Sequence, residues 1–192
     1  MGSSYNACLL ASYWIEKIAE IPTVCSNSSE FRYRDPIIED GTLIIPVSQS
    51  GETADTLSAS HLMKQSGYEQ LSIVNTKNTE LERITTNSIY MRANKEVGVA
   101  STKTFMSTLQ ILFTLALHLA ENSNPKLINN KLLDDFKNLP IYMNNIFHNS
   151  ELIKQIAKKY SEYSNFLYLG RGYNYPIAME GALKLKELSY VH

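Results

Sequence analysis

The sequence predicts an α/β fold, built as a doubly wound parallel sheet with helices on both faces. Two features carry this prediction. Short apolar runs alternate with helical patterns between residues 42 and 121, which is the pattern of βαβ units with right-handed crossovers. The first of these runs also passes through a hydroxyl-rich turn straight into a helical pattern, as a buried parallel strand does before its covering helix.

The first two thirds of the chain contain the expected sheet. Apolar residues on one helical face predict a helix over residues 6–19, which Pro22 ends, and residues 23–25 fit a short strand. Three further strands are expected at residues 42–47, 71–75 and 88–92. Helices are expected at residues 53–66, 81–84 and 101–121, with Gly67 as the C-cap of the first.

The remaining chain is mostly helical. The polar residues 122–125, which include a proline, break the pattern. Helices follow at residues 130–138, 141–148 and 151–163, and then a strand at residues 165–169. Gly170-Arg171-Gly172 repeats the strand–turn–helix plan of the first unit. We therefore divide the chain into a first unit with connecting helices, residues 1–149, and the beginning of a second such unit, residues 150–192.

The composition excludes several classes of protein. The chain has 192 residues, 44% of them hydrophobic, and a net charge of −1, which gives no basic field for nucleic acid or an anionic membrane. Cys8 and Cys25 fit reduced thiols and lack metal-ligand spacing, and the longest apolar stretch, residues 109–120, is too short to span a bilayer. We expect a cytoplasmic protein without a metal, a membrane or a nucleic-acid partner.

The turn at residues 48–53 is the strongest functional signal. Ser48, Ser50 and Thr53 surround Gly51 where a buried strand gives way to a helix. Free backbone N–H groups and the helix dipole favour an anion at such a position, and hydroxyl groups can complete the site. The turn contains no lysine or arginine, so amides and hydroxyls would hold a phosphate. An N-capped helix explains the same residues, because serine and threonine favour caps.

These residues resemble those of a known family. The turn is similar to the phosphosugar-binding loop of sugar isomerase (SIS) domains, and most similar to the loop in the isomerase half of the glucosamine-6-phosphate synthase family. Other stretches that resemble this family, in the same order, are Gly2-Ser3-Ser4-Tyr5-Asn6, Ser29-Glu30-Phe31-Arg32-Tyr33-Arg34, Val97-Gly98-Val99-Ala100-Ser101-Thr102-Lys103, Leu169-Gly170-Arg171-Gly172 and Glu180-Gly181-Ala182-Leu183-Lys184-Leu185-Lys186-Glu187. One loop would indicate only an SIS domain, whereas this set spans essentially the whole chain.

The resemblance implies a binding site for a phosphosugar, fructose 6-phosphate, and no cofactor. Matched by position, the residues that hold the phosphate are Ser48, Gln49, Ser50 and Thr53, and Ser3 and Ser4 add contacts at the start of the first helix. Val99 and Ser101 would approach the sugar from the loop before the helix at residues 101–121, although a plain N-cap also explains Ser101. Ser3 is a departure from the family, which usually has threonine there, but the hydroxyl is kept.

Lys184 and Glu187 are the candidate catalytic residues. They are three positions apart, and Glu180 lies four positions before Lys184, so all three project from one helical face. Ordinary surface ion pairs have the same spacing. The resemblance implies that Glu187 carries a proton between C1 and C2 of the sugar and that Lys184 assists it.

The family forms glucosamine 6-phosphate and glutamate from fructose 6-phosphate and glutamine, in hexosamine biosynthesis. The resemblance implies a fragment of such an enzyme, with a glutaminase domain as partner and assembly into a homodimer or larger. The family's ring-opening histidine and Schiff-base lysine would fall beyond His192, and a buried strand would precede Gly2, so we expect the chain alone to be inactive. Two alternatives stay open: a non-catalytic phosphosugar-sensing SIS module, and an aldose–ketose isomerase with one SIS unit.

Overall fold

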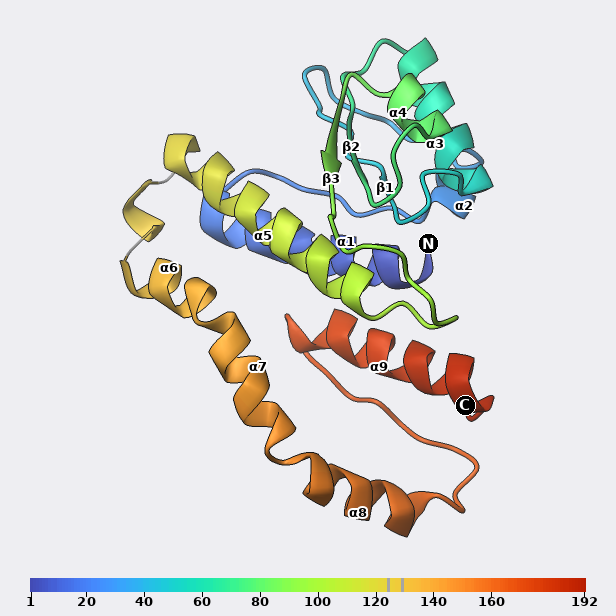
Figure 1. The fold of residues 1–192 in the computed structure, drawn as a ribbon. Coiled ribbons are helices and arrows are strands. Elements are labelled where there is room, and N and C mark those ends of the chain that lie inside the picture. Colours follow the sequence, from blue (N-terminus) through green and yellow to red (C-terminus); the bar gives the residue numbers. More distant parts are fainter. Residues whose placement is uncertain (124, 129) are drawn as a thin grey trace.

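The computed structural model describes residues 1–123, 125–128 and 130–192, and it has an α/β fold around a parallel sheet. Within these residues the sheet has three strands in the order β1 (Val47–Ser48), β2 (Leu71–Val74) and β3 (Asn87–Tyr90). Val47 pairs with Ile73, and Ile73 with Ile89, in parallel register. Figure 1 shows helices on both sides of this small sheet. The predicted fold class is confirmed.

β1 is shorter than the predicted strand at residues 42–47, because a proline interrupts its pairing. Ile44 forms an isolated parallel bridge with Gln70, and the carbonyl groups of Ile44 and Pro46 each accept a hydrogen bond from β2 at 3.0 Å. Pro46 has no N–H to donate in return. The chain therefore runs beside β2 from Ile44 onward, but regular pairing is limited to β1 itself.

Helices cover the two faces of the sheet in pairs. α1 (Gly2–Trp14) and α5 (Lys103–Ser123) pack against each other and against the face that carries Val47 and Ile73, where the main hydrophobic core lies. α3 (Ala54–Gln65) and α4 (Glu80–Ile84) pack together on the other side. Ser72, whose side chain alternates with that of Ile73, accepts a hydrogen bond from Thr85 at the end of α4 (3.0 Å).

The predicted helices of this half are present, with shifted ends. α1 begins at Gly2 rather than at residue 6, so its first turn contains Ser3 and Ser4, and the chain continues into a π-helical turn, η1 (Ile15–Ala19). α3, α4 and α5 confirm the helices predicted at residues 53–66, 81–84 and 101–121. No helix in the described residues is long and apolar enough to cross a membrane.

The strand expected at residues 23–25 is wrong. This segment joins no sheet among the described residues, because it packs beside α1, with Cys25 Sγ 3.8 Å from the Tyr5 carbonyl oxygen. A short helix that the sequence did not predict, α2 (Ser28–Phe31), follows it and contacts α3. Its N-cap, Asn27, accepts a hydrogen bond from the N–H of Ser29 at 3.4 Å.

The chain beyond α5 forms a series of short helices. They are η2 (Pro125–Leu127), α6 (Asn130–Lys137), α7 (Leu139–Phe147) and α8 (Ser150–Tyr160). The last three confirm the helices predicted at residues 130–138, 141–148 and 151–163. Asn124, part of the predicted break at residues 122–125, lies outside the described residues. Figure 1 shows α7 and α8 extending away from the sheet.

The strand expected at residues 165–169 is also wrong. The segment is extended but lies beside no strand in the described residues, and Leu167 and Leu169 are exposed. A strand needs a neighbour for its backbone groups, and here the N–H of Phe166 donates to the carbonyl of His192 at 2.8 Å. The chain then enters α9 (Asn174–Ser189), which packs along α1. The division of the chain at residue 150 stays a prediction.

Candidate functional site

The turn after β1 lies at the carboxyl end of the parallel sheet, where α/β proteins bind ligands. Hydrogen bonds within the turn stabilise its shape. Ser48 Oγ lies 2.9 Å from Thr53 Oγ1 and accepts a hydrogen bond from the N–H of Gly51 at 3.1 Å. Ser50 Oγ accepts a hydrogen bond from the N–H of Glu52 at 3.2 Å. α3 begins directly after Thr53. The turn therefore gathers hydroxyl groups at the entrance to a helix, with Ser48 itself buried.

The start of α4 supports this turn from behind. Gly51 has a φ of +69°, and a Cβ at this position would lie 2.3 Å from Thr79 Oγ1. The carbonyl of Gly51 accepts a hydrogen bond from the N–H of Leu81 at 3.1 Å. Thr79 is itself held in a capping box with Glu82, whose Oε2 accepts the N–H of Thr79 at 2.7 Å. The cap of α4 therefore fixes the backbone of the turn, and only glycine fits against it.

Asn75 connects the ends of the three strands. Its backbone N–H donates to the carbonyl of Gln49 in the turn at 3.0 Å. Its side-chain amide donates to the carbonyl of Asn94 at 2.7 Å, and its side-chain oxygen accepts the N–H of Ala93 at 3.0 Å. Asn75 directly follows β2, and residues 93 and 94 lie just beyond β3. One residue therefore holds the turn and the chain after β3 at the same edge of the sheet.

The loop before α5 carries the next two predicted site residues. Val99 is 95% exposed, and Ser101 is half-buried with its Oγ 2.7 Å from Thr104 Oγ1 in the first turn of α5. The Glu96 carboxylate accepts hydrogen bonds from the backbone N–H groups of Thr102 and Thr104 at 3.3 and 3.2 Å. Hydrogen bonding, above all from the Thr104 hydroxyl, lowers the pKa of Glu96 below its usual value. Glu96 is therefore ionised at neutral pH and caps α5.

The beginning of α1 meets α9 at a buried carboxylate. Glu180 is 6% exposed, and its two oxygens accept hydrogen bonds from Ser3 Oγ at 2.7 Å and from Asn6 Nδ2 at 2.8 Å. Lys184 Nζ lies 3.5 Å from Glu180 Oε1. A buried carboxylate is stable only when it is paired or hydrogen-bonded, and these partners come from both helices. The contacts therefore hold α9 against the end of α1 that carries Ser3 and Ser4.

Lys184 also reaches the second predicted catalytic residue. Its Nζ lies 2.5 Å from Glu187 Oε2, so one ammonium group lies between two carboxylates. The side chains of Lys184 and Glu187 are 20% and 31% exposed, so both are accessible from one side. A carboxylate next to a cation can move a proton between two adjacent carbons of a sugar while the cation stabilises charge on a neighbouring oxygen. The spacing read from the sequence therefore corresponds to a real contact.

The family model of the SIS domain matches residues 1–118. The chain belongs to the SIS domain family. It is 42% identical over 192 residues to the isomerizing glutamine–fructose-6-phosphate aminotransferase of Thermotoga maritima and 44% identical to that of Chlorobaculum tepidum. All of this chain aligns with them, but it spans only 32% and 31% of their lengths.

Solved structures are similar to this chain over its whole length, and one of them has high sequence identity. It is the C-terminal domain of glucosamine-fructose-6-phosphate aminotransferase from Francisella tularensis, with 40% sequence identity and a TM-score of 0.94. The similarity covers 100% of this chain and 55% of that chain. The fold is therefore shared with a domain larger than the present chain.

The predicted site residues of this SIS domain fall into separate groups. Ser48, Gln49, Ser50 and Thr53 share the turn after β1, and Ser3 joins Lys184 and Glu187 through Glu180. α1 contacts both β1 and α9, so it connects the two groups. Ser4 lies in the first turn of α1 beside Ser3. Val99 and Ser101 form a third group, on the loop before α5. Within the described residues, no side-chain hydrogen bond directly joins the site residues of the turn after β1, of the loop before α5 and of α1 with α9.

Several residues that organise this SIS site are absent from the sequence prediction: Asn6, Asn75, Thr79 and Glu96. Thr79 stands three positions before Glu82, which is the pattern of a capping box and could have indicated it. The partners of Asn6 and Asn75 are distant in the sequence, so no local pattern points to them. The spacing of Glu180 places it on the face of Lys184 but does not show that it is buried.

The two cysteines take no part in the site. Burial raises the pKa of the Cys8 thiol to about 12 and that of Cys25 to about 11. Both thiols are therefore protonated at neutral pH, and a protonated thiol is a poor nucleophile.

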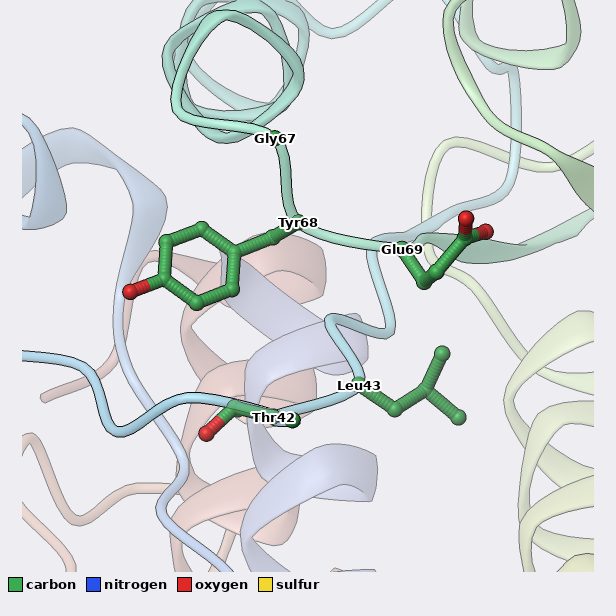
Figure 2. A pocket seen from close by; sticks show the side chains of 6 residues that line it. Thr42, Leu43, Gly67, Tyr68 and Glu69 are labelled. Atoms are coloured by element: carbon green, nitrogen blue, oxygen red, sulfur yellow. The ribbon is translucent and has the colours of Figure 1, made fainter.

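A shallow hollow at the other end of the sheet is a weaker candidate. Figure 2 shows the chain at Tyr68 and Glu69, after the end of α3, passing beside the segment of Thr42 and Leu43 that leads to β1. The hollow measures about 160 Å³ and is lined by Gly41, Thr42, Leu43, Gly67, Tyr68 and Glu69. These residues precede β1 and β2, so the hollow lies at the amino ends of the strands. Its charged side chain is a carboxylate, which disfavours an anion.

We predict that Gly51→Ala destabilises the protein more than Gly67→Ala does. Both glycines have a positive φ, +69° and +81°, so alanine costs each roughly 1–2 kcal/mol of backbone strain. At Gly51 the new methyl group also collides with Thr79, which adds about 1–3 kcal/mol, whereas nothing lies within 4 Å at Gly67. Urea unfolding of the two full-length variants measures the difference, and equal losses would show that Thr79 does not constrain the turn.

Proposed function

We propose that this chain is part of the isomerase domain of a glutamine–fructose-6-phosphate aminotransferase and binds fructose 6-phosphate. In this proposal the protein converts the ketose phosphate to the amino sugar glucosamine 6-phosphate, with ammonia released from glutamine. The observation that carries the proposal is the contact of Lys184 with Glu187 on α9, together with the docking of α9 on α1 through Glu180. The proposal is also supported by the sequence identity of 42% and 44% to the two aminotransferases over the whole chain.

The phosphate of the sugar binds at the turn after β1 in this proposal. Ser48, Ser50 and Thr53 supply hydroxyl groups, and backbone N–H groups at the start of α3 supply further donors. No lysine or arginine lies in the turn. Binding therefore relies on oriented dipoles, which contribute hydrogen bonds to a charged ligand of about 1.5–3 kcal/mol each. Gln49 and the hydroxyl groups of Ser3 and Ser4 complete the binding site.

The proton transfer falls to the residues of α9. Glu187, as a carboxylate, takes a proton from C1 of the imine that ammonia forms at C2 and delivers it to C2. The proton of the C1 hydroxyl passes to the nitrogen, so an aldehyde forms at C1, an amine forms at C2 and the carboxylate is restored. Lys184 lies 2.5 Å from Glu187 Oε2 and donates toward the oxygen on C1. Val99 and Ser101 bound the sugar from the loop before α5. In this arrangement the edge of the sheet binds the phosphate and α9 carries out the proton transfer.

The proposal extends to the organisation of the whole protein. Residues 1–149 form the first SIS unit with its connecting helices, and residues 150–192 begin a second. A glutaminase domain elsewhere in the protein supplies ammonia, and the reaction takes place in the cytoplasm. A non-catalytic module that senses phosphosugars would share the turn after β1, but it would not require the contact between Lys184 and Glu187.

We propose that the full-length protein is a homodimer or a larger assembly. Apolar side chains of α7 and α8 are exposed, more than a free surface usually leaves uncovered. They are Ile141, Tyr142, Ile146, Phe147, Leu152, Ile153, Ile156 and Tyr160. Analytical ultracentrifugation of the full-length protein tests this, and a sedimentation coefficient of a monomer at micromolar concentration would contradict it.

We predict that Ser50→Ala weakens the binding of fructose 6-phosphate about tenfold or more. Loss of one hydrogen bond to a charged group costs about 1.5–3 kcal/mol, which is at least tenfold in the dissociation constant. Isothermal titration calorimetry of the full-length variant measures this. Ser66→Ala is the matched control, because Ser66 lies at the far end of α3 and its hydroxyl bonds, within the described residues, to the Leu62 carbonyl of the same helix. Equal affinity of the two variants for fructose 6-phosphate would show that the turn only caps α3 and does not bind the phosphate.

We predict that Glu187→Gln lowers the rate of glucosamine 6-phosphate formation by about 10²–10⁴-fold, the usual size of an acid–base contribution. Affinity for fructose 6-phosphate should change only a few-fold, because the phosphate binds elsewhere. Lys186→Gln is the control, since the side chain of Lys186 is exposed on the same helix. Steady-state kinetics and titration of both variants decide the matter: a Glu187→Gln variant as active as the control would show that Glu187 does not carry the proton, whereas a wild type that binds fructose 6-phosphate without forming product would favour the sensing module.

A further inference from the structure

The loop before α5 contains a chain of hydrogen bonds that ends at Ser101. Glu96 Oε2 lies 2.8 Å from Thr104 Oγ1, and Thr104 Oγ1 lies 2.7 Å from Ser101 Oγ. Thr104 is 1% exposed, so water cannot replace either partner. Ser101 is half-buried and keeps one side open. The three groups therefore form a relay from a carboxylate at one end to an accessible hydroxyl at the other.

The direction of each bond in this relay follows from its end group. An ionised carboxylate only accepts hydrogen bonds, so the Thr104 hydroxyl must give its single proton to Glu96. The Thr104 oxygen can then only accept, and Ser101 must donate its proton to Thr104. The proton of Ser101 is thereby used inside the protein. What remains accessible on Ser101 Oγ is a lone pair.

We propose that Glu96 and Thr104 are positioning residues that fix the Ser101 hydroxyl as a hydrogen-bond acceptor toward the sugar. The inference rests on the proposed function, in which Ser101 faces the bound phosphosugar. A phosphate dianion offers acceptors only, whereas each sugar hydroxyl can donate. Ser101 therefore selects a hydroxyl group of the ligand and contributes nothing to the phosphate.

The same carboxylate that orients Ser101 also caps α5. Glu96 accepts the backbone N–H groups of Thr102 and Thr104, so the cap does not depend on the Thr104 hydroxyl. Thr104→Val therefore removes the relay and keeps the shape of the side chain, the backbone N–H and the cap. Thr104→Ser keeps the hydroxyl and loses only a methyl group. These two variants separate the relay from the fold.

The test uses analogues of fructose 6-phosphate in which one hydroxyl at a time is replaced by fluorine, which accepts a hydrogen bond but cannot donate one. In the full-length wild-type protein and in Thr104→Ser, one analogue should bind about tenfold more weakly than fructose 6-phosphate. In Ser101→Ala the loss at that position should disappear, which assigns it to Ser101. In Thr104→Val the loss should fall to about two- to threefold, because the freed Ser101 hydroxyl can rotate and donate.

Two results of this titration would overturn the relay. One is an unchanged tenfold loss in Thr104→Val, and the other is a wild-type protein that binds fructose 6-phosphate but tolerates fluorine at every position. A second measurement decides the relay without any sugar: the titration of the Glu96 carboxyl carbon by NMR. The Thr104 hydroxyl is the main cause of its lowered pKa, so Thr104→Val should raise that pKa and Thr104→Ser should not. A pKa unchanged in Thr104→Val contradicts the relay, whereas failure of the wild type to bind fructose 6-phosphate contradicts the proposed function.

Discussion

The buried carboxylate of Glu180 is the constraint on which the arrangement of this site depends. At 6% exposure it cannot rely on water, and its hydrogen-bond partners Ser3 and Asn6 belong to α1 while Lys184 belongs to its own helix. Removal of one partner of a buried charge typically costs about 3–5 kcal/mol, so α9 has one favoured position on α1. This position places Lys184 and Glu187 near the first turn of α1. The proposed catalytic pair is therefore positioned by a residue that need not touch the substrate.

The proposed binding half of the site is held by hydrogen bonds between side chains and backbone groups. Asn75 and the cap of α4 fix the turn after β1, and Glu96 fixes the loop before α5. Hydroxyl and amide dipoles that are already oriented cost little to reorganise when an anion binds. The one ammonium group in the network, Lys184, stays with Glu187.

The sequence predicts the elements whose signals are local and misses those that depend on distant partners. Apolar periodicity locates α3, α4, α5 and β2, and the spacing of Lys184 and Glu187 correctly places them on one face. The strands expected at residues 23–25 and 165–169 do not form, because a strand exists only where another strand accepts its backbone groups. Asn75, Glu96 and the burial of Glu180 escape prediction for the same reason. Pro46 shortens β1, which its lack of an N–H could have indicated.

We propose that one bound sugar lies between the turn after β1 and the carboxylate of Glu187. A crystal structure of the full-length protein with fructose 6-phosphate would test this arrangement. We expect the phosphate within hydrogen-bond distance of the hydroxyl groups of Ser48, Ser50 and Thr53, with a Glu187 oxygen beside C1 and C2. A phosphate bound elsewhere, or a Glu187 carboxylate turned away from these carbons, would contradict it.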